Sequence, residues 1–100
     1  MDIKLINRGN TGELLLDGRL DAASAADAEP IFMDVADRFE TVMLNLEKLD
    51  YTSSAGLRLI RTLQVTMNRK DGELQIKNAG PMVMEVFEMT GFASFLKFVK

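Results

Sequence analysis

The chain has 100 residues, of which 47% are hydrophobic and 27% are charged, and its formal net charge is −3 at pH 7. This length and balance predict one globular domain with its own core. The acidic balance argues against nucleic acid as a direct partner, because phosphate binding needs a basic surface. The chain contains no cysteine and no histidine, which excludes disulfides, metal sites built on these residues and Ser-His-Asp triads.

Membrane and cofactor signals are also missing from the sequence. No apolar run approaches the roughly 20 residues of a membrane-spanning helix, so we expect no membrane insertion. The first residues, Met1 to Lys4, lack the apolar segment of a signal peptide, and we therefore expect a cytoplasmic protein. Neither a phosphate-cradling P-loop nor a dinucleotide motif is present, so no cofactor is expected.

The N-terminal third predicts a hairpin followed by a helix. Two strands are expected at 2–7 and 13–20, joined by a glycine-containing turn cluster, and such a short connection makes them antiparallel. Asp21 then has the position and chemistry of an N-cap for a helix that ends near Arg38. Pro30 interrupts the helical pattern and is expected either to kink this helix or to divide it.

The middle of the chain predicts a strand, a polar loop and a second helix. Residues 41–46 are apolar at nearly every position, which is typical of a central strand buried on both faces. A loop from Leu49 to Ser54 should follow it. Residues 57–67 carry apolar side chains at helical spacing. Open α/β sheets place their sites at the carboxyl ends of the strands, so this loop is the candidate site.

The C-terminal part completes an alternating pattern. Residues 73–77 alternate as a strand does. Pro81 suits the first position of a helix that ends at Gly91, and residues 95–99 form a last short strand. The order is therefore β-β-α-β-α-β-α-β. It predicts an α/β fold with a mostly parallel mixed sheet and an antiparallel N-terminal strand.

The polar residues near the predicted loop carry no clear catalytic pattern. Asp17, Asp21 and Asp50 lie near strand ends, where carboxylates are able to hold Mg²⁺ but more often act as solvated caps. Ser53 and Ser54 have no histidine base, and Lys48 lies on the same loop without a partner, so catalysis is not expected. A small-ligand or nucleotide sensor is a further class, for which the sequence offers no pocket signature.

Three segments, in this order along the chain, resemble the STAS domain family, in particular bacterial anti-sigma factor antagonists. They are Gly18-Arg19-Leu20-Asp21-Ala22, then Asn45-Leu46 followed by Asp50 to Leu57, then Asn78-Ala79-Gly80-Pro81 followed by Val86-Phe87 and Gly91-Phe92. The resemblance covers essentially the whole chain. It implies the STAS fold and a single STAS domain over residues 1–100.

The same resemblance implies that a loop serine is phosphorylated by a cognate anti-sigma factor serine kinase. The family loop commonly reads Asp-Ser-[Ser/Thr]-Gly-Leu, and alignment on Gly56 and Leu57 places Ser53 at the aspartate and Ser54 at the phosphoacceptor. Ser53 itself is a second possible acceptor. The residues implied in partner binding are Asp21, Thr52, Ser53, Ala55, Gly56, Leu57 and Arg58.

The implied cycle is partner switching. The unmodified protein binds the anti-sigma factor kinase, phosphorylation of Ser54 releases it, and a PP2C-type phosphatase restores the binding form; ATP and Mg²⁺ belong to the kinase. The resemblance also allows an alternative, an accessory subunit that docks on a lipid-transport ABC ATPase without phosphorylation.

Several of these residues also have simpler interpretations. Ser53 and Ser54 would serve as an ordinary helix N-cap, as would Asp21, and capping is compatible with a switch. Arg58 and Arg61 are interpreted as a solvated helix face, with a partner surface as the alternative. The methionines between 82 and 89 cannot all face the core together with their valine neighbours, so some are expected to be exposed.

Overall fold

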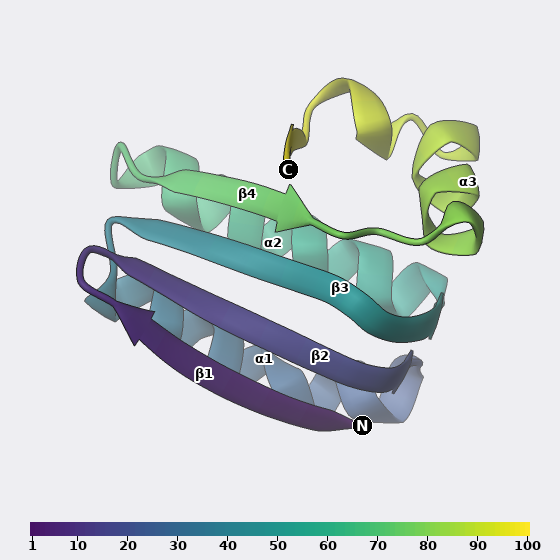
Figure 1. Ribbon diagram of the computed structural model, residues 1–100, viewed down its shortest axis with the longest axis horizontal. Coiled ribbons are helices and arrows are strands. Elements are labelled where there is room, and N and C mark those ends of the chain that lie inside the picture. Colours follow the sequence, from purple (N-terminus) through teal and green to yellow (C-terminus); the bar gives the residue numbers. More distant parts are fainter.

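The computed structural model describes all residues 1–100 and contains a five-stranded sheet with the strand order β1-β2-β3-β4-β5 (Figure 1). The strands are β1 Asp2–Arg8, β2 Thr11–Leu20, β3 Thr41–Thr52, β4 Glu73–Lys77 and β5 Lys97–Val99. β1 pairs antiparallel with β2, and every later neighbouring pair is parallel. The predicted element order and the mixed, mostly parallel sheet are confirmed.

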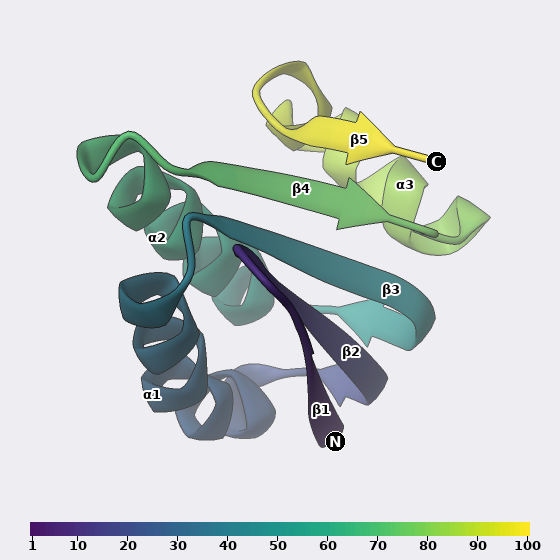
Figure 2. The same ribbon diagram turned by 60° about the vertical axis from the view of Figure 1, so that its left-hand side comes forward.

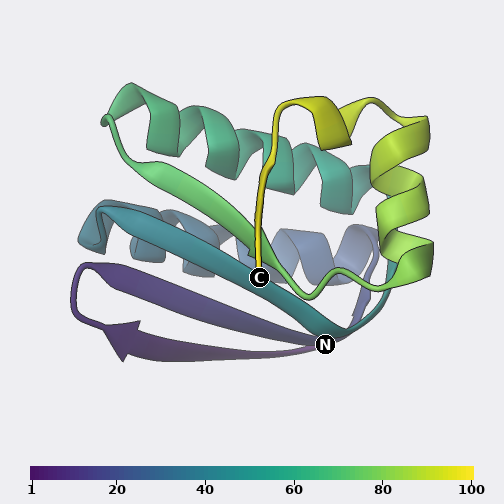
Figure 3. The same ribbon diagram turned by 45° about the horizontal axis from the view of Figure 1, so that its top comes forward.

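Three helices connect the parallel strands. They are α1 Ala22–Arg38, α2 Ser54–Arg69 and α3 Pro81–Met89, and a 3₁₀ turn at Phe92–Ser94 follows α3. α1 and α2 lie side by side on one face of the sheet (Figure 2). α3 lies beyond the carboxyl end of β4, beside β3 (Figure 3). None of these helices is long and apolar enough to cross a lipid bilayer.

The core lies between the sheet and the two helices that cover it. Leu14 of β2 and Leu44 of β3 are fully buried there, and so are Phe32 of α1 and Leu63 of α2. The residues that alternate with them along β3 are only half-buried, because no helix covers the other face of the sheet. The prediction that residues 41–46 are buried on both faces is therefore wrong.

The strand β3 is longer than predicted. It continues through the expected loop to Thr52, and α2 begins at Ser54 rather than at residue 57. Only Ser53 lies between the two elements. Against β2, β3 carries extra residues at two register shifts, near Leu15/Asp17 and Gly18/Arg19, and such bulges disrupt the simple alternation by which strands are recognised.

Two smaller differences concern the N-terminal half. The turn between β1 and β2 consists only of Gly9 and Asn10, so β2 begins two residues before the prediction. Helix α1 runs without a break through Pro30, which is exposed, while Ala28 and Phe32 on either side are buried in the core. The core contacts hold the helix together across the missing N–H, and the expected division is wrong.

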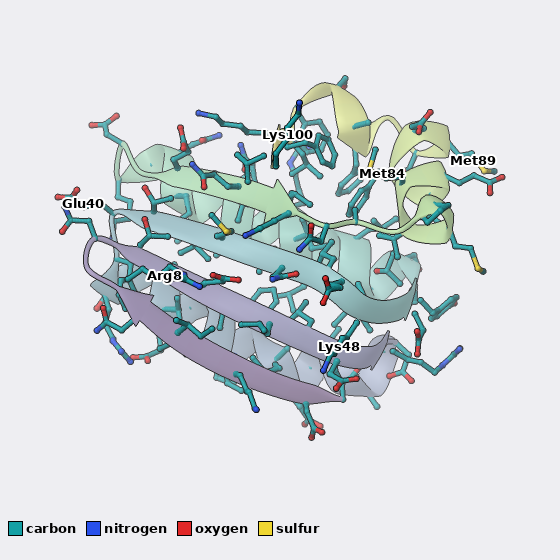
Figure 4. The ribbon with its side chains drawn as sticks, viewed as in Figure 1. Arg8, Glu40, Lys48, Met84, Met89 and Lys100 are labelled. Atoms are coloured by element: carbon teal, nitrogen blue, oxygen red, sulfur yellow. The ribbon has the colours of Figure 1, made fainter.

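The uncovered face of the sheet carries a buried charge, Glu13, whose residue is only 2% exposed. Its carboxylate accepts hydrogen bonds from Asn45 Nδ2 at 2.9 Å and from Arg8 Nε at 2.6 Å, and Arg8 lies across this face in Figure 4. The hydrogen bond from Asn45 and the ion pair with Arg8 outweigh the effect of burial. Together they hold the pKa of Glu13 below its ordinary value of 4.5.

This lowered pKa makes a prediction about acid stability. Ionised Glu13 stabilises the fold above pH 4.5, and this contribution is lost as the pH falls from there through the lower pKa of the folded state. The variant Glu13→Gln should have a free energy of unfolding lower by about 1 kcal/mol at neutral pH. Its stability should also fall less steeply on acidification, as measured by urea unfolding from about pH 7 to about pH 3.

Glu47→Gln is the matched control for that measurement, because Glu47 is exposed on the same sheet and its carboxylate makes no hydrogen bond. The control should keep the acid dependence of the wild type. If both variants flatten the pH profile equally, the network around Glu13 is not its source.

Candidate functional site

Ser53 joins the end of β2 to the start of α2. Its N–H and its Oγ both donate to the carbonyl oxygen of Leu20, at 2.9 and 3.1 Å. The same Oγ accepts the N–H of Gly56 at 3.2 Å, so Ser53 is the N-cap of α2. The hydroxyl of Ser53 is therefore engaged both as donor and as acceptor.

Ser54 differs from the other serines of the chain. It is the first residue of α2, it is exposed, and its hydroxyl makes no hydrogen bond. Each of the others donates its hydroxyl to a backbone carbonyl oxygen, Ser24 to Arg19, Ser53 to Leu20 and Ser94 to Gly91. Ser54 thus presents the one serine hydroxyl that is free of internal bonds.

The position of Ser54 suits an added anion. The first N–H groups of a helix lack partners within the helix, and the helix dipole places partial positive charge there. The first turn of α2 contains no acidic residue that would already use this field. A negative group on Ser54 would therefore be accommodated by the fold.

Asp21 is the N-cap of α1, which confirms its interpretation as a cap. Its Oδ1 accepts the N–H of Ser24 at 2.9 Å and the Oγ of Ser24 at 3.1 Å, and its own N–H donates to Ser24 Oγ at 2.9 Å. These hydrogen bonds from Ser24 hold the pKa of Asp21 below its ordinary value. Because Asp21 directly follows Leu20, an ionised carboxylate lies at the same edge of the sheet as Ser53.

Three of the predicted partner-binding residues are buried beneath this edge. They are Thr52, Gly56 and Leu57. A Cβ on Gly56 would overlap Thr52 Oγ1 and would come within 2.8 Å of Leu20 Cγ, so only glycine permits this approach of α2 to β2. These three residues pack beneath the turn and fix its conformation. Their direct contact with a partner stays a prediction.

Ala55 and Arg58 are more accessible than these residues and line a groove between α1 and α2. The groove has a volume of about 340 Å³. Its lining residues are Ala22, Ala25, Ala26, Glu29, Ala55, Arg58, Leu59 and Thr62. Small side chains on both helices keep it open, and it begins next to Ser54.

A second group of exposed side chains near this edge was not predicted as functional. Arg19 and Tyr51 are register partners of β2 and β3, and the Arg19 guanidinium lies 4.3 Å from the centre of the Tyr51 ring. Tyr51 also lines a small pocket of about 40 Å³ with Met82, whose residue is 71% exposed. Both Arg19 and Tyr51 lie in segments that resemble the STAS family. Their pairing, however, depends on a strand register that the sequence does not reveal.

The methionines of α3 and the two arginines of α2 differ among themselves in exposure and contacts. Met84 packs against the core, whereas Met82 and Met89 are exposed, Met89 pointing away from the fold (Figure 4). Arg58 is solvated as interpreted, but the Arg61 guanidinium lies 4.9 Å from the centre of the Phe95 ring. Arg61 is therefore partly committed to an internal contact.

The other chemistries considered find no support in this geometry. No three Asp or Glu side chains are grouped as a metal site would require, so Asp17, Asp21 and Asp50 do not form one. Lys48 lines a cavity of about 240 Å³ on the uncovered face of the sheet, together with Asp17 and Asn45. Neither serine of the turn lines that cavity.

Comparison with known proteins identifies the family. The family model described as "STAS domain" matches residues 2–100. A Bordetella bronchiseptica protein, "Putative anti-sigma factor antagonist BtrV", is 39% identical over 80 residues, which cover 79% of this chain and 69% of that protein.

Solved structures share the fold at low identity. The anti-sigma factor antagonist SpoIIAA in its unphosphorylated form is 18% identical with a TM-score of 0.80, over 99% of this chain and 88% of that one. The phosphorylated form of SpoIIAA, from Bacillus, is 19% identical with a TM-score of 0.78, over 99% and 92%. A Thermotoga maritima protein is 14% identical with a TM-score of 0.92, over 98% and 86%. The match along nearly the whole chain and the shared fold show that this chain belongs to the STAS domain family.

Proposed function

We propose that this chain is an anti-sigma factor antagonist that is switched by phosphorylation of Ser54. Unmodified, it binds an anti-sigma factor serine kinase. The kinase transfers the γ-phosphoryl group of ATP to Ser54 Oγ, ADP leaves, the hydroxyl proton passes to a base of the kinase or to solvent, and the complex separates. A PP2C-type phosphatase hydrolyses the phosphoserine and restores the binding form. The observation that carries the proposal is the exposed hydroxyl of Ser54, free of internal bonds at the start of α2.

The switch would act through charge. A phosphate adds about −1.5 to −2 charges at neutral pH. It would lie at the sheet edge that already holds the Asp21 carboxylate, which the hydrogen bonds of Ser24 keep ionised. A partner surface that packs against a neutral Ser54 would then meet like charge or a costly desolvation. The effect falls on the complex, because the helix N-terminus itself tolerates the anion.

The groove between α1 and α2 offers the partner a concave surface beside Ser54. Arg58 lies one helical turn after Ser54, so the two side chains share a helix face. In the unmodified protein Arg58 lines the groove beside Ala55. A phosphate on Ser54 would draw this guanidinium toward itself and change the lining of the groove as well as its charge.

The site of modification is tested by intact mass. After incubation with the cognate anti-sigma factor kinase and ATP, the wild type should gain one phosphate and Ser54→Ala should gain none. Ser94→Ala is the matched control, since Ser94 is also exposed but its hydroxyl is bonded to Gly91. A full gain in Ser54→Ala, or fragment masses that place the phosphate on Ser53, would contradict the assignment.

The effect of charge is tested by Ser54→Asp, with Ser54→Asn as the neutral control of similar shape. The aspartate should weaken kinase binding by roughly tenfold or more, and the asparagine by much less. The melting temperature of Ser54→Asp should be unchanged or slightly raised, because an acid in the first turn stabilises a helix by about 0.3–1 kcal/mol. Equal weakening by both variants, or unfolding of Ser54→Asp, would show that Ser54 matters through its shape or its capping instead.

The accessory-subunit alternative predicts a different partner. A subunit of a lipid-transport ABC ATPase would co-purify with that membrane ATPase and would retain the complex in Ser54→Asn. Recovery of such a complex from the native organism, together with no gain of phosphate by the wild type in the presence of the kinase, would contradict the proposed switch and favour the accessory subunit.

A further inference from the structure

Strand β1 forms a long and regular free edge of the sheet (Figure 1). It pairs with β2 along all seven of its residues without a register shift, and it contains no proline. Leu5 and Ile6 are 37% and 36% exposed on it. Natural edge strands are usually short, bulged, covered or charged, because unpaired N–H and C=O groups invite another strand, and of these devices β1 has only the charges of Asp2, Lys4 and Arg8. The opposite edge follows this rule, since β5 has three residues.

The hairpin turn determines which groups of β1 face outward. Gly9 has φ 77° and is the first of two turn residues, as in a type II′ turn. Such a turn is closed by a hydrogen bond between its flanking residues, here Arg8 and Thr11. Because antiparallel pairs alternate, Arg8 and every second residue before it bond to β2. The backbone groups of Ile3, Leu5 and Asn7 therefore point away from the sheet.

We propose that two copies of this chain pair through β1, antiparallel, about a two-fold axis at Leu5. In this register Leu5 faces Leu5 of the partner subunit, and Ile3 faces Asn7 of the partner subunit. All three outward residues meet their counterparts as hydrogen-bonded pairs. Centring the axis on Ile3 or Asn7 would leave one end of the strand unpaired.

Charge favours the same register. Asp2 faces Arg8 of the partner subunit, and the pair occurs twice by symmetry. Within one copy, Asp2 lies directly opposite Asp17 in the β1–β2 register, which is an unfavourable pairing of like charges. Arg8 binds Glu13 through Nε, so its two terminal nitrogens are available for Asp2 of the partner subunit.

The pairing is closed and leaves the Ser54 surface free. A two-fold contact uses each β1 edge once, so it ends at two copies rather than growing into a fibre. Ser54 and Asp21 follow the carboxyl ends of β3 and β2, and neither lies on β1. The inference is therefore independent of the function proposed above.

Single cysteines test the register directly, because the chain has none of its own. Leu5→Cys should form a disulfide-linked dimer under mild oxidation, since facing residues of a hydrogen-bonded antiparallel pair have Cα atoms about 5.5 Å apart. Ile3→Cys or Asn7→Cys alone should not, because each would lie roughly 13 Å along the strand from its own copy. An equal mixture of those two variants should cross-link, as shown by non-reducing electrophoresis and intact mass.

The wild type and a backbone variant supply the second measurement. Sedimentation velocity of the wild type should show a dimer fraction that rises with concentration. Leu5→Pro removes an N–H that has no partner within one copy, so it should stay folded and monomeric, whereas Leu5→Val should still dimerise. A wild type that is monomeric throughout, or equal cross-linking of all three single-cysteine variants, would overturn the proposal.

Discussion

The candidate site depends on a single acceptor, the carbonyl oxygen of Leu20. It receives the N–H and the hydroxyl of Ser53 and thereby fixes the start of α2 beside the end of β2. Because Asp21 is the next residue and caps α1, the same oxygen brings the N-termini of two helices together. Two helix dipoles then direct partial positive charge at one surface, where Asp21 partly offsets it. An added phosphate on Ser54 would make the net charge at this surface negative.

Ser53, which aligns with the aspartate that the resemblance implies for the family loop, is the N-cap of α2 in this arrangement. An aspartate or a serine is able to cap α2, because either supplies an oxygen to the N–H of Gly56. Only the serine hydroxyl also donates a hydrogen bond, and here it donates to Leu20. Ser53 therefore both caps α2 and bonds to the end of β2. The Ser53 hydroxyl is therefore engaged, whereas the Ser54 hydroxyl makes no hydrogen bond.

The sequence predicts the elements well where periodicity or a cap marks them. Asp21 and Pro81 begin α1 and α3 as expected, and the strand 73–77 is found at its predicted bounds. The end of β3 was missed because its two bulges against β2 destroy the alternation of buried and exposed residues. Burial of Glu13 was missed for a related reason. Its partners Arg8 and Asn45 come from two neighbouring strands, and no local pattern connects them.

The bulges that obscure the end of β3 in the sequence affect the site more than the free edge of the sheet. The extra residues belong to β3, and the first of the two shifts falls at Leu15/Asp17, where β2 still pairs with β1 on its other side. A bulge increases the local twist of a strand and turns the side chains that follow it. Tyr51 comes to lie beside Arg19 on the exposed side while Thr52 stays buried beneath Gly56. The edge of the sheet remains regular enough for strand pairing because the extra residues belong to β3, and the pairing of β1 with β2 has no register shift.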